Sequence, residues 1–292
     1  MRTISGRTRL VGIIGWPVGH SFSPAMHNAA FQALELDWAY VPLPVRPDQL
    51  ADAIRGVRAL GFRGVNVTIP HKEAVMPLLD DLSPAAQVIG AVNTIVVAPA
   101  PLHPGTLAQV GENTDWTGFL ASLRDAGFDP AGKRCAVIGA GGGARAVVYA
   151  LARAGGHPAV FNRTLERAIR LVEDLRAAFP DTRLEAHPLE ELRQIGGETA
   201  LLVNTTPLGM SNAQDDASPW PDALPIPSHL TVYDLVYNPL ETKLLRQARE
   251  AGAVAIGGLG MLVHQGAEAF RLWTGLEPPI DVMMEEIRCC DF

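Results

Sequence analysis

The sequence predicts an α/β protein of two α/β domains, each built around a mostly parallel β-sheet. Two observations predict this fold. Short apolar runs of strand length alternate with segments of helical spacing through the first hundred residues, and the same alternation restarts after Gly132. Such a series is typical of βαβ units, whose consecutive strands lie parallel in one sheet. Because the series is interrupted once, we expect two separate sheets.

In the first series, apolar runs predict strands over residues 9–15, 38–45, 64–69 and 90–97. Helical spacing predicts helices over residues 25–36 and 48–60, and another that begins near His71 and Lys72. Ser23-Pro24 has the pattern of an N-cap followed by proline at the first helical position. The proline-rich stretch 98–105 is expected to form a hairpin or loop. A helix from Asn113 or Thr114 to Ala126 would connect the two series.

The second series predicts strands near residues 136–139, 159–162, 184–187, 201–205, 231–236 and 254–256. A stretch with four prolines, 219–227, is expected to be an ordered surface loop. The amphipathic segment 261–273 is expected to fold back on the first domain. The expected domains are therefore residues 1–113, joined by C-terminal helices within 260–292, and residues 114–259.

The composition excludes several classes of function. The 292 residues carry a net charge of −7, which argues against broad binding to nucleic acid or to anionic membranes. No run of about 18 apolar residues and no signal-peptide core is present, so we expect a cytoplasmic protein. The three cysteines, Cys135, Cys289 and Cys290, form neither a disulfide framework nor a zinc-ligand spacing. We therefore expect free thiols and no bound metal.

A glycine cluster, Gly139-Ala140-Gly141-Gly142-Gly143-Ala144, follows the apolar run 136–138 and precedes helix-forming residues. Strand, glycine turn and helix in this order form a dinucleotide pocket. Gly139 would permit the tight turn, Gly141 the approach of a pyrophosphate, and Ala144 the packing of helix on strand. The N-terminus of the helix would direct its N–H groups at the phosphates. A glycine-rich turn without a ligand is the alternative at this point.

The end of the next strand indicates which dinucleotide binds. An NAD site usually has Asp or Glu there, to bind the ribose 2′-hydroxyl. This chain instead has Asn162-Arg163-Thr164, with Arg167 one turn further on. Arginine would bind a 2′-phosphate through charge-assisted hydrogen bonds, which favours NADP. The alternative is two solvated arginines at a helix start with Thr164 as N-cap, although cations there are disfavoured without an anion.

Polar residues also gather at predicted strand ends in the first domain. Lys72 follows Asn66 and Thr68 at the end of a strand, where ligands bind in open α/β sheets. Lys72 is either a proton donor or an ordinary surface lysine. Asn93 lies at another strand end. Asp115 is either a first-turn carboxylate, which stabilises a helix by itself, or the partner of Lys72.

The helix predicted over residues 25–36 begins with hydroxyl side chains. Ser21 and Ser23 lie at its N-terminus, which is suited to binding a carboxylate. The Ser21 hydroxyl is expected to have no structural role. His27, within the helix, is expected to be packed rather than catalytic.

Taken in order, these stretches resemble the motifs of the shikimate dehydrogenase family over nearly the whole chain. The similar stretches are Gly15–Asn28, Asn66–Lys72, Gly90–Thr94, Asn113–Asp115, Gly139–Gly142, Asn162–Thr164, Asn204–Met210, Tyr233–Pro239 and Met261–Ala267. Trp116 departs from the family pattern, because a smaller residue is more usual after the aspartate.

The resemblance implies a reversible, NADP-linked interconversion of 3-dehydroshikimate and shikimate, a step in chorismate and aromatic amino acid biosynthesis. It implies Lys72 and Asp115 as the catalytic pair. It implies substrate contacts from Ser21 and Ser23, which would hold the carboxylate, and from Thr68, Asn93, Tyr237 and Gln265. The implied cofactor-binding residues are Gly139, Ala140, Gly141, Gly142, Gly143, Ala144, Asn162, Arg163, Thr164, Arg167, Thr205, Met210 and Gly258, with Met210 near the nicotinamide.

Hydride transfer needs cofactor and substrate in near contact. The active site is therefore expected in a cleft between an N-terminal substrate-binding domain and a Rossmann-like NADP-binding domain. We expect small-molecule partners, no nucleic acid, no membrane, and a monomer or homodimer. Two alternatives are a dual quinate/shikimate dehydrogenase and a non-catalytic protein that binds NADP(H) or a shikimate-like acid. The intact pair Lys72 and Asp115 favours an enzyme.

Overall fold

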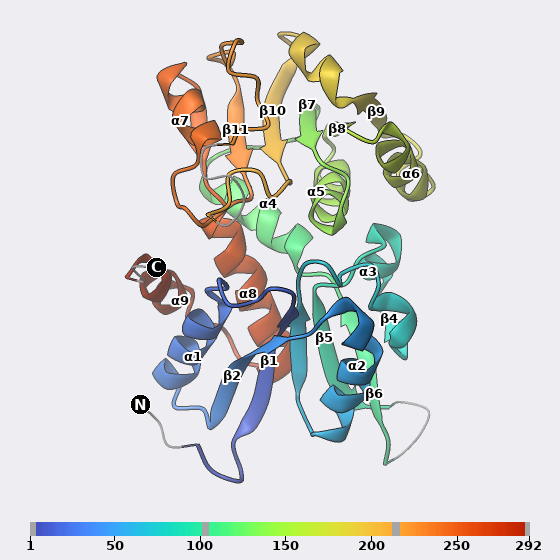
Figure 1. Cartoon of the computed structure of the whole chain (residues 1–292), viewed down its shortest axis with the longest axis vertical. Coiled ribbons are helices and arrows are strands. Elements are labelled where there is room, and N and C mark those ends of the chain that lie inside the picture. Colours follow the sequence, from blue (N-terminus) through green and yellow to red (C-terminus); the bar gives the residue numbers. More distant parts are fainter. Residues whose placement is uncertain (1–3, 101–104, 212–216, 290–292) are drawn as a thin grey trace. The chain divides into compact units, whose positions relative to one another are not determined.

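A computed structural model describes residues 4–100, 105–211 and 217–289 of the chain (Figure 1). The chain divides into two compact units. Unit 1 comprises Met1–Thr114 with Val263–Phe292, and unit 2 comprises Asp115–Leu262. Both units are mixed helix and strand, as the alternating pattern predicts. The cleft expected between the two domains stays a prediction.

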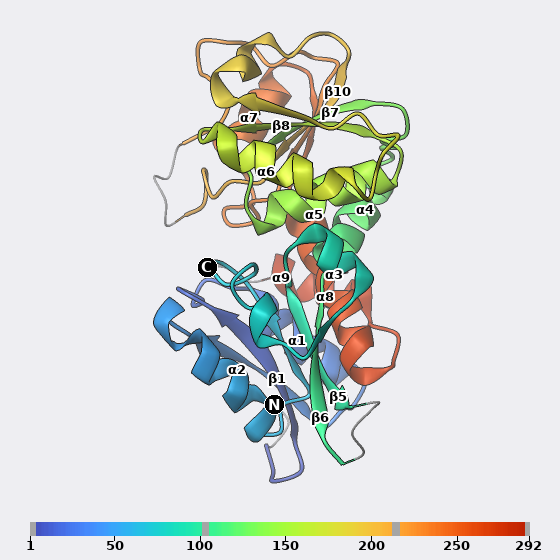
Figure 2. The same cartoon turned by 90° about the vertical axis from the view of Figure 1, so that its right-hand side faces the viewer.

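Unit 1 is a six-stranded sheet with helices on both faces (Figures 1 and 2). Its strands are β1 (Arg9–Gly15), β2 (Trp38–Pro44), β3 (Gly64–Val67), β4 (Asp81–Leu82), β5 (Thr94–Pro99) and β6 (Leu107–Glu112). Its helices are α1 (Ser23–Ala33), α2 (Leu50–Ala59), α3 (Pro84–Ile89), α9 (Ile280–Arg288), the 3-10 turns η1 (Pro47–Gln49) and η2 (Met76–Leu78), and most of α8 (Leu259–Thr274).

The sheet of unit 1 has the strand order β2-β1-β3-β5-β6-β4. The pairings β1–β2, β1–β3 and β4–β6 are parallel, whereas β3–β5 and β5–β6 are antiparallel. Strand alternation sends Val65 and Val67 to the face covered by α2, and Gly64 to the face where Trp273 of α8 packs. Trp273 Nε1 donates to the Ile95 carbonyl at 3.0 Å, which holds α8 against the sheet.

Unit 2 is a six-stranded, wholly parallel sheet in the order β12-β11-β10-β7-β8-β9. Its strands are β7 (Arg134–Ile138), β8 (His157–Asn162), β9 (Glu185–Pro188), β10 (Thr199–Asn204), β11 (Thr231–Asp234) and β12 (Val254–Ile256). Its helices are α4 (Asp115–Asp125), α5 (Gly142–Arg153), α6 (Leu165–Arg176), α7 (Lys243–Glu250) and the 3-10 helix η3 (Leu189–Gln194). This order is that of a Rossmann fold, and the order reverses between β7 and β10.

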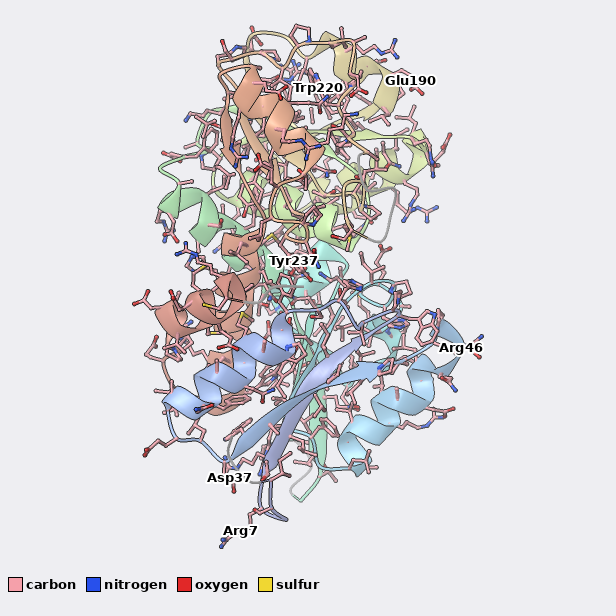
Figure 3. The ribbon with its side chains drawn as sticks, turned by 60° about the vertical axis from the view of Figure 1, so that its left-hand side comes forward. Arg7, Asp37, Arg46, Glu190, Trp220 and Tyr237 are labelled. Atoms are coloured by element: carbon pink, nitrogen blue, oxygen red, sulfur yellow. The ribbon has the colours of Figure 1, made fainter. Side chains whose placement is uncertain are left out.

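Both faces of the second sheet are covered, which explains its nearly continuous apolar strands. Phe119 of α4 lies edge-on to Tyr233 at 5.0 Å on one face. On the other face Leu244 of α7 joins the cluster that contains Val232. Trp220 belongs to the same cluster and is 4% exposed (labelled in Figure 3). The proline-rich stretch 219–227 is therefore ordered, as expected, but its Trp220 is a core residue rather than part of a surface loop.

The prediction of a helix near His71 is wrong, because residues 72–75 form turns and only the short η2 follows. The carbonyl of Lys72 accepts a hydrogen bond from Val92 N at 2.8 Å. In an α-helix that carbonyl would accept from residue 76. A long-range backbone hydrogen bond thus takes the acceptor that a helix would need.

Two other local predictions in unit 1 are also wrong. Ser23 is the first residue of α1, and the N-cap is Phe22, whose side chain makes no capping bond. Ser21 Oγ accepts from Ser23 N at 3.3 Å, so the Ser21 hydroxyl does have a structural contact. The stretch 98–105 belongs to a hairpin, as expected, because Ala98 and Pro99 end β5 and pair antiparallel with β6. Residues 101–104 of that stretch lie outside the described residues.

Two cysteines lie within the described residues. Both Cys135, which is buried, and Cys289, which is exposed, are free thiols. Cys290 lies outside the described residues. In the described part of the chain no helix has the length and apolar character needed to cross a bilayer, and no cluster of potential metal ligands occurs.

His27 is fully buried in the core between α1 and α8. Its ring stacks on Tyr40 at 4.4 Å and lies 5.4 Å from the ring of Trp273. Neither ring nitrogen has a hydrogen-bond partner among the described residues. Burial lowers the pKa of His27 from 6.5 to about 3, because the charged imidazolium cannot be solvated there. His27 is a packed residue, as expected.

The buried imidazole predicts a pH-dependent stability. Between pH 6.5 and about 3 the unfolded chain protonates His27 and the folded chain does not, so the free energy of unfolding falls as the pH falls. The slope from this one group is at most about 1.4 kcal/mol per pH unit. His27→Leu should be close to wild-type stability at pH 7 and gain on the wild type as pH falls to 4, measured by urea unfolding. Phe31→Leu, a neighbouring core substitution, should show no such trend; an equal trend in both variants would contradict the assignment to His27.

Candidate functional site

The glycine turn lies at the carboxyl end of β7, beside the point where the strand order of unit 2 reverses. Gly139 has a φ of +112°, and a Cβ built there would overlap Thr205 Oγ1. Gly141 is the N-cap of α5, and a Cβ built there would meet nothing within 4 Å. Gly139 is thus required by the fold, whereas Gly141 faces open space where a ligand can approach. Ala144 is fully buried, as its predicted packing role requires.

The start of α5 is suited to an anion. Gly141 has no side chain to cap the first-turn amides, and no acidic residue lies in the first turn. Uncapped N–H groups and the helix dipole together favour phosphate. The predicted residues Ala140, Gly142 and Gly143 belong to this same turn, so the structure brings the whole glycine cluster to one helix N-terminus.

Arg163 and Arg167 lie beyond the end of β8 at the start of α6, and both side chains are exposed. Neither arginine forms an ion pair within the described residues, whereas Arg145 and Arg134 in the same unit do. Thr164 occupies the N-cap position, but its side chain makes no capping bond. Asn162 Nδ2 donates to the Thr164 carbonyl at 2.8 Å and shapes the turn between strand and helix. Two unpaired cations therefore remain available to an anionic ligand.

The predicted residues Thr205, Met210 and Gly258 lie beside the other strand ends of unit 2. Thr205 follows β10, and its hydroxyl donates to the Ile138 carbonyl of β7 at 2.7 Å. A Cβ on Gly258 would overlap the carbonyl oxygen of Leu235, so the segments after β11 and β12 approach more closely than a side chain permits. Only glycine fits at residue 258.

In unit 1 the polar residues also gather at strand ends. Figure 3 labels Asp37 just before β2 and Arg46 just after it, which marks the carboxyl edge of the parallel strands. Gly15 ends β1 at this edge, and a Cβ built on it would overlap Thr68. Trp16 N donates to the Ile69 carbonyl at 3.0 Å. The segment that carries Ser21 and Ser23 therefore starts against the segment that carries Thr68.

Asn93 is the centre of a buried hydrogen-bond network in unit 1. Its Oδ1 accepts from Thr114 N at 2.7 Å, and its Nδ2 donates to Thr114 Oγ1 at 3.0 Å and to Gln265 Oε1 at 3.3 Å. Its carbonyl accepts from Val67 N at 2.8 Å. Asn93 and Gln265 are 2% and 9% exposed, so the predicted substrate residues of two distant segments are fixed against one another.

Sequence reasoning missed the second half of this network. Asn66 Nδ2 donates to Thr94 Oγ1 at 3.0 Å, and Asn66 Oδ1 accepts from Tyr40 Oη at 2.7 Å. Thr94 Oγ1 in turn donates to Asn93 Oδ1 at 3.1 Å. The one signal in the sequence is the amide residue Asn66 within an otherwise apolar strand, since a buried polar side chain needs partners.

The two predicted catalytic residues belong to different units. Lys72 is half-buried, and its carbonyl is bound to Val92, the residue before Asn93. Asp115 begins α4 and directly follows Thr114, so it is also the first-turn carboxylate that the helix dipole favours. The structure thus agrees with the first-turn interpretation of Asp115, and its pairing with Lys72 stays a prediction.

Trp116 is accommodated within unit 2. Its ring lies edge-on to Tyr149 of α5 at 5.4 Å, and the guanidinium of Arg153 lies over it at 5.7 Å. The departure from the family pattern is therefore a packing contact between α4 and α5, away from the glycine turn at the start of α5.

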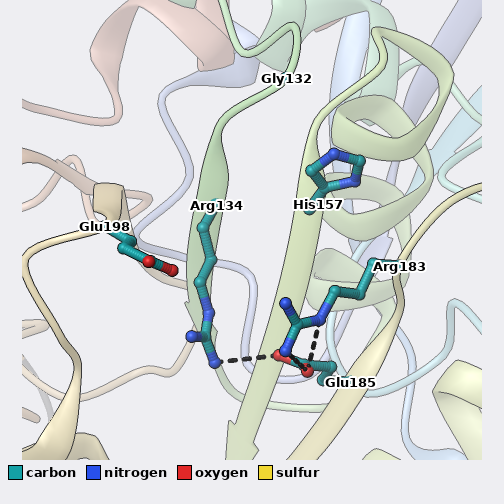
Figure 4. A pocket seen from close by; sticks show the side chains of 6 residues that line it. All are labelled: Gly132, Arg134, His157, Arg183, Glu185 and Glu198. Atoms are coloured by element: carbon teal, nitrogen blue, oxygen red, sulfur yellow. Dashed lines mark hydrogen bonds and ion pairs between the residues drawn. The ribbon is translucent and has the colours of Figure 1, made fainter.

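One pocket of unit 2 is distinct from all of these residues. Arg134, His157 and Glu185, the first residues of β7, β8 and β9, line it together with Gly132, Arg183 and Glu198 (Figure 4). Glu185 accepts from Arg134 at 2.9 Å and from Arg183 at 2.7 Å. Partial burial would raise the pKa of Glu185, but the hydrogen bond from Arg183 and the charges of Arg183 and Arg134 hold that pKa below its usual value. The pocket lies at the amino ends of the strands, whereas ligands of such sheets bind at the carboxyl ends.

The Rossmann strand order, the glycine turn and the unpaired arginines place the chain in the class of dinucleotide-binding α/β proteins. Two family models identify it further. The shikimate dehydrogenase substrate binding domain matches residues 13–95, and the shikimate 5'-dehydrogenase C-terminal domain matches residues 258–288. A relative named shikimate dehydrogenase (NADP(+)), from Symbiobacterium thermophilum, is 50% identical over 284 residues, which cover 96% of this chain and 94% of the relative. The chain belongs to the shikimate dehydrogenase family.

Solved structures of shikimate 5-dehydrogenases resemble this chain in fold and in sequence. Shikimate 5-dehydrogenase from Thermus thermophilus, in complex with NADP(H) and shikimate, has a TM-score of 0.82 and 41% identity, over 96% of this chain and 98% of that chain. Shikimate 5-dehydrogenase from Listeria monocytogenes, in complex with shikimate and NAD, has a TM-score of 0.87 and 37% identity, over 98% of this chain and 99% of that chain. The two-domain α/β fold is therefore shared with these enzymes.

Two glycines of the turn should respond differently to the same substitution. Gly139→Ala should lower the free energy of unfolding by about 1–3 kcal/mol, because of its positive φ and the overlap with Thr205. Gly141→Ala should cost less than about 1 kcal/mol, since its Cβ meets nothing, yet should weaken dinucleotide binding. Thermal unfolding and calorimetric titration with NADPH measure the two effects. Unchanged NADPH affinity in Gly141→Ala would rule out the close approach of the pyrophosphate.

Proposed function

We propose that this chain is an NADP-dependent shikimate dehydrogenase, which reduces 3-dehydroshikimate to shikimate with NADPH in a reversible reaction. The product serves the biosynthesis of chorismate and the aromatic amino acids. The observation that carries the proposal is the buried network at Asn93, which fixes polar side chains from separate segments of unit 1 at the carboxyl edge of its sheet.

The cofactor site fits NADP(H) on the residues present. The open space at Gly141 leaves room for the pyrophosphate at the N-terminus of α5. Arg163 and Arg167 supply the cations for the 2′-phosphate, and Asn162 and Thr164 shape the turn between β8 and α6. Thr205, Met210 and Gly258 would also contact the cofactor, with Met210 near the nicotinamide. When bound, NADPH supplies the hydride, which no side chain can provide.

The substrate is held by hydrogen bonds from side chains that its hydroxyl and carboxylate groups match. Ser21 and Ser23, at the start of α1, bind the carboxylate, where the helix N-terminus favours negative charge. Thr68, Asn93, Tyr237 and Gln265 bind the ring hydroxyls. Because the contact of Asn93 with Gln265 and Thr114 fixes its amide, this part of the site is formed before substrate arrives.

Lys72 and Asp115 carry out the proton transfer of the reaction. Reduction of the substrate carbonyl would leave negative charge on its oxygen, and that charge must be neutralised. The Lys72 ammonium donates a proton to that oxygen, which becomes the hydroxyl of shikimate, and Lys72 regains a proton from solvent. Asp115 accepts a hydrogen bond from the reacting hydroxyl and orients it. In the reverse direction neutral Lys72 would remove the hydroxyl proton of shikimate.

The proposed site draws on residues of one chain, so a monomer or homodimer suffices. We place the activity in the cytoplasm, where its free thiols stay reduced.

The proton role predicts a specific loss of turnover. Lys72→Ala should lower kcat by about 10²- to 10⁴-fold, because the developing alkoxide loses its proton donor, while shikimate binding is partly kept. Steady-state rates with NADPH and 3-dehydroshikimate, together with titration of shikimate, measure the two effects. Lys133→Ala, a lysine beside Phe128 in unit 2, is the matched control and should keep wild-type kcat. Undiminished turnover in Lys72→Ala would remove Lys72 from the mechanism.

Initial rates in the four pairings of NADP or NAD with shikimate or quinate test the proposed function directly. NADP with shikimate should give the highest kcat/KM; equal or greater kcat/KM with quinate would favour the dual enzyme instead.

Arg163→Ala should raise the KM for NADP and leave that for NAD almost unaffected, since only NADP carries a 2′-phosphate. Arg176→Ala, an exposed arginine in the last turn of the same helix, should change neither. Equal losses with both cofactors would show that Arg163 does not read the phosphate.

A further inference from the structure

A buried carboxylate in unit 2 lies outside the residues assigned above. Asp234 is the last residue of β11, is fully buried, and forms no ion pair within the described part of the chain. Its carboxylate instead accepts three hydrogen bonds. Oδ1 accepts from Asn204 Nδ2 at 2.9 Å and from Val236 N at 3.1 Å, and Oδ2 accepts from Thr242 Oγ1 at 2.7 Å.

Asn204 extends these contacts to the loop after β10. It is the last residue of that strand and is also fully buried. Its Oδ1 accepts from Thr206 N at 2.9 Å and from Thr206 Oγ1 at 2.7 Å, and its Nδ2 also donates to the Leu208 carbonyl at 3.3 Å. One side chain therefore sets the path of residues 205–211, which we call the β10 loop and which carries Thr205 and Met210.

Asp234 itself sets the loop after β11. Its bond from Val236 N turns the chain into residues 235–238, the β11 loop, which carries Tyr237 (labelled in Figure 3). The two loops are also joined at their far ends, because Ser211 Oγ donates to Asn238 Oδ1 at 2.8 Å and Ser211 N donates to the Asn238 carbonyl at 3.1 Å. Thr242, the third donor to Asp234, caps the start of α7.

The chemistry of an ionised carboxylate suits this position. Burial raises the pKa of Asp234 to about 6, so at neutral pH the group is ionised. An ionised carboxylate only accepts hydrogen bonds and forms stronger ones than a neutral group. Burial of a charge without a counter-ion is costly, and its three donors must offset that cost. A merely packed position at the strand end would be filled at lower cost by an apolar residue.

We propose that Asp234, acting directly and through Asn204, is a positioning residue that holds the β10 loop and the β11 loop in one fixed arrangement. The loops carry a predicted nicotinamide contact, Met210, and a predicted substrate contact, Tyr237. The Asp234–Asn204 pair thereby couples the placement of cofactor and substrate in unit 2. This inference rests on the proposed function for the roles of Met210 and Tyr237.

Asp234→Asn tests the proposal in the full-length protein. The amide keeps the size of the side chain but replaces one acceptor oxygen with a donor. Hydrogen–deuterium exchange of backbone amides in the β10 and β11 loops should accelerate about tenfold or more, because loop opening becomes easier. The Kd for NADPH should rise about tenfold and kcat should fall, as expected for the loss of a charge-assisted bond.

Tyr233→Phe is the matched control. It lies one residue earlier in the same strand and loses a buried hydrogen bond, from Tyr233 Oη to Ser122 Oγ at 2.8 Å, that touches neither loop. It should lower the unfolding temperature without changing loop exchange, NADPH affinity or kcat. Equal changes in both variants would reduce Asp234 to a structural role, and unchanged loop exchange and Kd in folded Asp234→Asn would overturn the proposal.

A second variant covers the case in which Asp234→Asn does not fold. Thr242→Val removes one of the three donors and keeps the side-chain shape, and it should give smaller changes of the same sign in loop exchange and NADPH affinity. No change in either would also overturn the proposal. Wild-type protein without activity on NADPH and 3-dehydroshikimate would contradict the proposed function, whereas the loop exchange of the variants still tests the positioning role by itself.

Discussion

Several segments of unit 1 are held together by one buried side-chain amide, that of Asn93, which must have hydrogen-bond partners. A buried polar side chain without partners is costly, and Asn93 avoids that cost only if several segments meet at it. Its bonds to Thr114 fix the entry to α4, and its bond to Gln265 fixes α8, a helix 172 residues further along the chain. The same arrangement that satisfies the amide creates a preorganised polar surface, which is what a site for a hydroxylated acid requires.

In unit 2, buried polar side chains at strand ends also hold separate segments together. Asn204 and Asp234 are the last residues of adjacent parallel strands, and their side chains bind the backbone of the loops that follow. Parallel strands end at one edge of a sheet, so a buried polar residue at each end controls the loops where ligands bind. Gly139 and Gly258 act in the complementary way, by allowing backbone segments to approach where any side chain would collide. Satisfied polar groups and close backbone approach together shape the edge where we propose that the cofactor binds.

Local sequence patterns predict the strands more reliably than the short helices and the helix caps. All six strands of unit 2 were expected near their observed places, because a buried parallel strand must be a short apolar run. In unit 1 the two-residue strand β4 and the helix α3 are not predicted, and β6 is implied only by the hairpin expected at 98–105. The helix expected at His71 is absent since Val92 takes the Lys72 carbonyl, a partner twenty residues away that no local pattern contains. Ser23 has the residue type of an N-cap, yet the turn made by Ser21 places Ser23 inside the helix.

The sequence by itself determined the α/β class, the parallel dinucleotide unit with its glycine turn, the arginines after β8, and the family. These follow from spacing and residue type within short stretches, which the chain displays directly. Only the tertiary structure decided which polar residues meet. The bonds from Tyr40 to Asn66, from Asn66 to Thr94 and from Asn204 to Asp234 link residues 26 to 30 positions apart in the chain. Hydrogen-bond partners are chosen by the packing of whole strands and helices, and that packing has no local signature in the sequence.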